Sequence, residues 1–268
     1  MRVLARTAGT LLIITLAGAG AGCGREPGTR STAGTSDAAS SAISSSPASV
    51  VKGTPLTTAQ ALVLSRMLLN DHDAGGADVS VRAPAGAMPA FEMRGTVDWL
   101  HHQGRVTVHF KGAASQPDEV LVWSDANLFI AVPGLGDAMA AKGRQGITFA
   151  SRPLQSGTTT LDQVIVLVSS LASDRAENPI LLRQADTGYL GPGEIDGVQH
   201  ERFRYGATVY WVEPAERIGR VEATLRTTGS AVVIDLTDHG ARQVGVPAAD
   251  GVVPAAEITD VLSALVRN

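Results

Sequence analysis

The residues that could carry out chemistry in this chain are few and scattered. Six histidines are present, and two of them, His101 and His102, are adjacent in the sequence. Neighbouring residues near a strand end point apart, so this pair indicates a solvated turn rather than a metal site. Asp235 and Asp238 could act as paired carboxylates, but they precede Gly240 at a strand end, where Asp is favoured for turn geometry alone.

The motifs that usually mark an enzyme are missing from the sequence. It contains no Gly-x-Ser-x-Gly elbow, no His-Glu-x-x-His zinc motif, no phosphate-binding glycine loop and no dinucleotide fingerprint. We therefore expect a protein that is not an enzyme and has no catalytic residue, metal or cofactor. Trp99, Trp123 and Trp211 each fall on a strand pattern. Core packing is the simpler interpretation for them, and lining a ligand pocket is the alternative.

Cys23, the one cysteine among 268 residues, points to a covalent modification. Two arginines precede an apolar run, Leu11–Leu16, and the small residues Ala17–Gly22 lead into the cysteine. This order is typical of a signal peptide, and the run is shorter than the ~20 residues of a spanning helix. We expect cleavage before Cys23 and lipidation of its thiol, although Gly20 stands where lipoproteins usually have Leu. The alternative is a stray cysteine in an ordinary secretory signal.

Lipidation would hold the chain on the outer, extracytoplasmic face of the cell membrane. Removing residues 1–22 takes away two arginines and no acidic residue, so the net charge goes from −4 to −6. A negative chain with 4% aromatic residues disfavours nucleic acid as a partner. Residues 23–54 are rich in Ser, Gly, Ala, Thr and Pro, which predicts a disordered tether. Residues 55–268 have the size of one domain.

Apolar residues at helical spacing predict three helices and one short helical turn in this domain. The first helix follows a capping box formed by Thr57 and Gln60 and ends near Asn70. The second begins at Thr160, capped by that residue, and the third follows Pro254. The short helical turn is Pro179–Leu182. The apolar stripe of the second helix consists of Leu161, Val164, Ile165, Val168 and Leu171. That of the third helix consists of Ile258, Val261, Leu262 and Leu265.

Alternation of period two predicts half-buried antiparallel strands between the helices. Asp196-Gly197 adds a hairpin signal. The order of helix, strands, helix, strands and helix predicts an α+β fold with one large antiparallel sheet and helices gathered on one face. The predicted strands are 78–82, 91–99, 105–110, 120–132 (more than one strand), 198–205, 208–213, 219–227, 231–237 and 242–246.

A strongly curved sheet over apolar helices can enclose an apolar cavity. The apolar residues at alternate positions of the early strands are the candidates for lining this cavity, because alternate residues of a strand share one face of the sheet. The candidate ligand-binding residues are Phe91, Met93, Val97, Trp99, Val106, Val108 and Phe110.

The order of these segments resembles the LppX/LprG group of actinobacterial lipoproteins, which are relatives in fold of the LolA carrier and of the sensor RseB. The likeness covers the whole domain and is strongest in its C-terminal third. The stretches that carry it are Leu56–Ala83, Gly95–Trp99, Gly104–Phe110, Asn178–Ala185, Gly193–Phe203, Tyr210–Glu213, Gly219–Leu225 and Ile234–Pro247.

The resemblance implies a curved half-barrel with helices on its concave face and an apolar cavity that binds or transfers an acylated lipid or glycolipid. It implies no particular residue as a ligand contact. The likeness to RseB implies a second hypothesis, a non-enzymatic sensor or interaction module that docks a membrane protein and whose cavity is filled by side chains.

Overall fold

The structure is a computed structural model, and it describes residues 52–83, 90–111, 118–155, 159–225, 229 and 231–266. The chain divides into two units, Met1–Ser49 and Val50–Asn268, and every described residue belongs to the second. Cys23 and most of the predicted tether lie outside the described residues. Within the described residues the helices are α1 (Thr58–Ala74), α2 (Leu135–Ala141), α3 (Thr160–Ser169), α4 (Pro179–Gln184) and α5 (Thr259–Val266).

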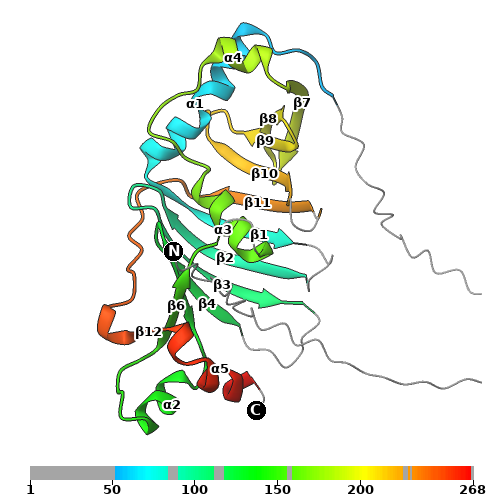
Figure 1. Ribbon diagram of the computed structural model, residues 1–268. Coiled ribbons are helices and arrows are strands. Elements are labelled where there is room, and N and C mark those ends of the chain that lie inside the picture. Colours follow the sequence, from blue (N-terminus) through cyan, green and yellow to red (C-terminus); the bar gives the residue numbers. More distant parts are fainter. Residues whose placement is uncertain are drawn as a thin grey trace, which may run out of the picture. The chain divides into compact units, whose positions relative to one another are not determined.

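Twelve strands of the described residues form one open sheet, which confirms the predicted α+β fold with a large curved antiparallel sheet and helices on its concave face (Figure 1). The strand order across the sheet is β12-β6-β5-β4-β3-β2-β1-β11-β10-β9-β8-β7. Neighbours are antiparallel except β12 and β6, which run parallel. The strands are β1 (Gly76–Ala83), β2 (Phe91–Asp98), β3 (Gln103–Phe110), β4 (Glu119–Trp123), β5 (Asn127–Ala131), β6 (Phe149–Pro153), β7 (Thr187–Ile195), β8 (Val198–Tyr205), β9 (Thr208–Val212), β10 (Ile218–Thr224), β11 (Ala231–Thr237) and β12 (Val252–Pro254).

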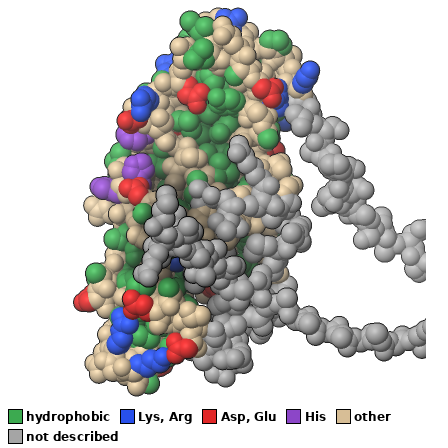
Figure 2. Space-filling model, viewed as in Figure 1, with side chains coloured by type: hydrophobic (Ala, Val, Ile, Leu, Met, Phe, Trp, Pro, Cys, Tyr) green, Lys and Arg blue, Asp and Glu red, His purple; other side chains and the backbone are tan. Residues whose placement is uncertain are grey.

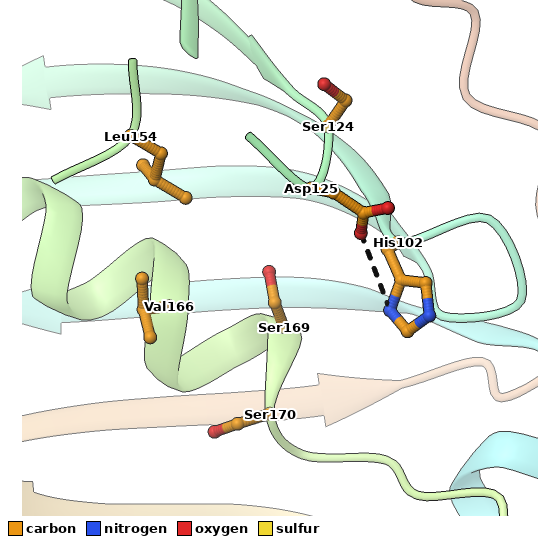
Figure 3. Close-up of a pocket in the computed structure, with 7 residues that line it drawn as sticks. All are labelled: His102, Ser124, Asp125, Leu154, Val166, Ser169 and Ser170. Carbon is orange, nitrogen blue, oxygen red and sulfur yellow. Dashed lines mark ion pairs between the residues drawn. The ribbon is translucent and has the colours of Figure 1, made fainter. Parts of the chain in front are cut away.

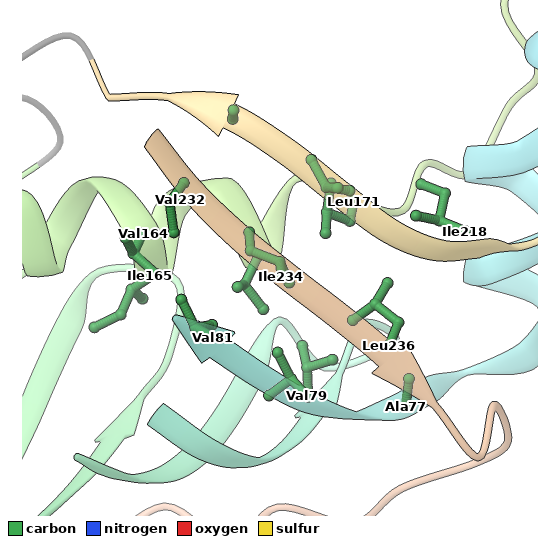
Figure 4. Packing of buried hydrophobic residues seen from close by; sticks show 14 of the residues in the cluster. Ala77, Val79, Val81, Val164, Ile165, Leu171, Ile218, Val232, Ile234 and Leu236 are labelled. Carbon is green, nitrogen blue, oxygen red and sulfur yellow. The ribbon is translucent and has the colours of Figure 1, made fainter. Parts of the chain in front are cut away.

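Helix α3 covers the middle of the concave face. Its apolar side chains pack against the inward residues of β1 and β11 in one buried cluster (Figure 4). The five residues predicted as its apolar stripe are all buried, from 0% to 7% exposed. Full burial of one such side chain contributes roughly 1.5–3 kcal/mol, so this stripe accounts for the position of the helix.

A second cluster lies at the β6 and β12 edge, where α2 and α5 pack together. At the opposite end of the sheet, α4 packs against α1 (Figure 1). The concave face is therefore covered by helices in three places, and the helices at its two ends belong to different parts of the sequence.

Several predicted boundaries are corrected by the structure. Helix α1 continues past Asn70 to Ala74, because Gly75 has the left-handed φ of 90° that ends the helix there. The cap of α3 is Thr159 and not Thr160, since the Thr159 hydroxyl accepts a hydrogen bond from the amide of Asp162. The capping box of Thr57 and Gln60 is confirmed.

The predicted strand at 242–246 is wrong. The neighbouring strand β11 is already paired on both sides, with β1 and with β10. Arg242 instead donates a hydrogen bond to Asp78 Oδ1 on β1, at 3.1 Å, and another to the carbonyl of Asp238. These contacts hold the segment against the sheet without adding a strand to it.

Candidate functional site

The seven candidate ligand-binding residues come from β2, β3 and the turn between them. The register pairs Phe91 with Phe110, Met93 with Val108 and Gly95 with Val106, so they share the concave face as predicted. All seven belong to, or pack against, the cluster that also contains the apolar side chains of α3. Phe110 is partly buried. The other six are no more than 2% exposed: Phe91, Met93, Val97, Trp99, Val106 and Val108. The structure thus brings the candidates together but buries them beneath α3.

Two tryptophans fix the C-terminal end of α3. The indole N–H of Trp99 donates to the carbonyl of Val168 at 3.1 Å, and that of Trp123 donates to the Ser169 hydroxyl at 3.0 Å. Both rings are no more than 2% exposed and pack in the core cluster, and Trp99 also borders a cleft. Trp211 differs, because its neighbours across the strands are Arg202 and Arg220, which place it on the opposite, convex face of the sheet.

A cleft lined by both polar and apolar side chains lies beside the same end of α3 (Figure 3). His102 and Asp125 face each other there with Nδ1 and Oδ1 3.9 Å apart, beyond hydrogen-bond distance, and both side chains are mostly exposed. This arrangement does not provide an oriented base for a serine nucleophile. The cleft of about 220 Å³ is lined by His102, Ser124, Asp125, Leu154, Val166, Ser169 and Ser170. A neighbouring cleft of about 390 Å³ is lined by His72, Trp99, His102, Ser169, Ala172, Ser173 and Asp174.

Two further residues with potential chemistry, His101 and Asp235, have structural partners. His101 Nδ1 lies 2.8 Å from Asp98 Oδ2, whereas His102 Nδ1 faces Asp125, so the two adjacent imidazoles have different partners. Asp235 forms ion pairs with Arg82 at 2.9 Å and with Arg220 at 2.5 Å. Within the described part of the chain, no three His, Cys, Asp or Glu side chains are grouped in a way that could hold a metal ion.

A buried Asp-His pair was not predicted from the sequence. Asp71, in the last turn of α1, is 0% exposed, and its Oδ1 lies 3.4 Å from His239 Nε2. The same Oδ1 accepts a hydrogen bond from the amide of Ile218 at 3.3 Å. Burial raises the pKa of Asp71 to about 8 and lowers the pKa of His239. Both groups favour the neutral form, and neither is accessible to a substrate, so the pair is structural.

The accessible apolar part of the concave face lies over β7, β8 and β9. All three tyrosines of the sequence lie there. The register aligns Tyr189 with Phe203 and Phe203 with Tyr210 across the three strands, while Tyr205 lies two residues after Phe203 and shares its face. Phe203 is fully buried, whereas Tyr205 is 37% exposed. We call these four residues the aromatic strip.

Two carboxylates accompany the aromatic strip. Glu201 accepts a hydrogen bond from Tyr189, and this bond, with burial, raises the pKa of the tyrosine to about 12. Burial, with the nearby charge of Glu177, likewise raises the pKa of Tyr210 to about 12. The strip therefore combines apolar rings with hydroxyl and carboxylate groups. Figure 2 shows a band of hydrophobic surface in this upper part of the molecule, between α1 and the strands β8 to β10.

The sequence contained a signal for this strip. Phe203 and Tyr205 alternate within one predicted strand, and Tyr210 lies in the next, so the period-two pattern placed aromatic residues on one face of two neighbouring strands. Tyr189 could not be assigned to this face, because no strand was predicted before the hairpin signal at Asp196-Gly197.

No family model and no curated protein matches this chain. Among solved structures, an uncharacterized conserved protein from Thermus thermophilus is similar over 74% of this chain and 99% of its own, with 10% sequence identity and a TM-score of 0.38.

Proposed function

We propose that the protein is a membrane-anchored extracytoplasmic lipoprotein that binds or transfers an acylated lipid or glycolipid on the concave face of its sheet. The observation that carries this proposal is the aromatic strip. It continues the apolar concave face beyond α3 and leaves part of it accessible to a ligand. The strip suits a lipid because the aromatic rings offer apolar contact area, while the tyrosine and glutamate oxygens can hydrogen-bond a polar head group.

The anchor belongs to the same proposal. The signal-like segment before Cys23 and the resemblance to the LppX/LprG group support it. No helix of the described residues is long and apolar enough to cross a membrane. The ligand and the membrane would then be the two partners of the protein.

A second function is favoured by one specific observation. Six of the seven residues expected to line a cavity are buried in packed contact with other side chains. That is the property expected of a sensor or interaction module that docks a membrane protein through a half-barrel whose cavity is filled. The two functions differ in whether an acyl chain contacts the aromatic strip.

A pair of variants distinguishes the two functions. Tyr210 and Val209 are adjacent on β9 and lie on opposite faces of the sheet, because their partners on β8 are Phe203 and Arg204. A fluorescently labelled diacyl phospholipid should bind about tenfold more weakly to Tyr210→Ser, and with unchanged affinity to Val209→Ser. Equal affinities in two variants that fold equally well by circular dichroism would contradict binding on the strip.

A further inference from the structure

The end of the molecule formed by α1 and α4 carries an exposed apolar patch. Ile180 and Leu181 on α4 are 65% and 61% exposed, and Leu62 on α1 is 41% exposed. Leu182, the next residue of α4, is 2% exposed and belongs to the core. Because Leu182 holds one side of this short helix against the domain, Ile180 and Leu181 are directed away from it. We call Leu62, Ile180 and Leu181 the apolar tip.

The two helices present these side chains on one surface. Arg183 of α4 donates a hydrogen bond to the hydroxyl of Thr58 on α1, at 3.4 Å. Leu62 lies one helical turn after Thr58 and therefore on the same side of α1, facing the region of α4. Asn178 caps α4 by accepting from the amides of Ile180 and Leu181, which fixes the start of the helix.

The chain enters the domain beside the apolar tip. Thr54 pairs with Tyr189 at the edge of β7 through two backbone hydrogen bonds of 2.8 Å each, and α4 contacts β7. Figure 1 shows this entering segment passing β7 and reaching α4 and the start of α1 at one end of the molecule. Cys23 lies only 29 residues before Lys52, the first described residue. An anchor at Cys23 would therefore be joined to the domain at this end.

The apolar tip is also close to the aromatic strip. The amide of Gly206, in the turn that follows Tyr205, donates to the carbonyl of Asp186 just after α4, at 2.9 Å. Glu177, which lies near Tyr210, is separated from α4 only by its cap Asn178. The open end of the strip therefore lies beside the tip.

We propose that the apolar tip docks into the surface of the lipid bilayer to which the chain is anchored and so presents the aromatic strip to membrane lipids. This inference rests on the proposed membrane anchor and adds a second contact with the bilayer. The segment that contains α4 carries charges of both signs, with Arg175 and Arg183 alongside Glu177 and Asp186 in the sequence. The docking is therefore hydrophobic in origin and should be insensitive to salt, in contrast to binding through a basic patch.

The test uses the chain from residue 23 onward with Cys23→Ser, which cannot be lipidated and contains no cysteine. A cysteine introduced by Leu181→Cys is labelled with an environment-sensitive fluorophore, and the matched control is Val198→Cys. Val198 is 48% exposed, but it follows the hairpin turn at the far end of β7 and β8. On adding phosphatidylcholine vesicles, the label at 181 should shift to the blue in low and high salt, and the label at 198 should not.

Cosedimentation with the same vesicles measures the strength of docking. The double variant Ile180→Ser and Leu181→Ser should partition into vesicles about tenfold less than the Cys23→Ser chain, and Val198→Ser should partition equally. Equal partitioning of the double variant, or no partitioning of any chain, would overturn the proposal. A dimer in solution that the double variant abolishes would also overturn it, because the tip would then be an interface between two copies.

The failure of docking can be distinguished from the failure of the proposed function. Lipid that copurifies with the protein, without vesicle docking, would leave lipid binding intact and remove the tip proposal. Docking of a protein that carries no lipid would support the tip and remove lipid carriage.

Discussion

Replacing Asp71 with Asn should change how the stability of the protein depends on pH. The pKa of Asp71 is raised by burial to about 8, from an ordinary value of 3.8. Between these two pH values the folded protein keeps a proton on Asp71 that the unfolded chain has released. The wild-type free energy of unfolding therefore falls as pH rises through this window, by about 1.4 kcal/mol per pH unit from this group. Asn cannot titrate, so this contribution is absent from the variant.

Between pH 6.5 and 8 the effect of Asp71 is separated from that of His239. The pKa of His239 is lowered from 6.5 by burial, so its stabilising contribution is fully present above pH 6.5 and is lost only as the pH falls below that value. The free energy of unfolding of Asp71→Asn minus that of wild type should therefore increase by about 2 kcal/mol between pH 6.5 and 8. Asn also keeps an oxygen that can accept from the Ile218 amide.

Urea denaturation at half-unit steps of pH measures this difference, on chains that all carry Cys23→Ser. Asp73→Asn is the matched control, because Asp73 lies in the same last turn of α1 with a side chain 67% exposed. Its profile should run parallel to that of wild type. A parallel profile for Asp71→Asn, or a wild-type stability that rises relative to the variant with pH, would refute the assignment of a neutral carboxyl to Asp71.

Three further substitutions test the packing of α3 and β4, each by the free energy of unfolding in urea. Arg152→Met should destabilise the fold by about 3–5 kcal/mol, because Asp162 is 0% exposed and would lose the 2.6 Å ion pair that compensates its buried charge; a loss below about 1 kcal/mol would contradict this. Trp123→Phe should cost about 1–3 kcal/mol by removing the N–H that binds Ser169, and an unchanged midpoint would argue against that contact. Gly104→Ala should cost about 1–3 kcal/mol or more, since its methyl group would lie 1.9 Å from the Trp123 ring. Tolerance of alanine there would show that the ring can move.

Strong local patterns predicted much of the fold. Strands 198–205 and 231–237 have the predicted bounds. In 231–237 the alternation of buried and exposed residues is regular, with one face buried in the core. The hairpin at Asp196 and Gly197 is confirmed, with positive φ at both residues, as a two-residue turn with this twist requires.

Short elements without periodicity were missed. Helix α2 has seven residues and follows Gly134, which supplies no side-chain cap, and β12 has three residues that pair with β6. Neither segment contains enough residues to show a period, and both form because their apolar residues join the second cluster.

The sequence pattern identified a shared face of the sheet but did not identify the aromatic strip. The apolar phase of β2 and β3 identified one face of the sheet correctly, because alternation alone decides which residues share a face. It could not show that α3 would cover that face, since the contact joins segments far apart in the sequence, such as Trp99 and Val168. The accessible aromatic strip depends on the register of β7, β8 and β9, which the sequence pattern does not specify.

Lipid carriage is tested most directly by native mass spectrometry of the chain from residue 23 with Cys23→Ser. The protein is exported and purified without detergent from an actinobacterial host, and its lipid is then extracted with organic solvent. We expect a stoichiometric adduct with the mass of a lipid that has at least two acyl chains, and a reduced adduct for Tyr210→Ser but not for Val209→Ser. A folded protein that shows only its own mass would contradict lipid carriage and favour the module that docks a membrane protein.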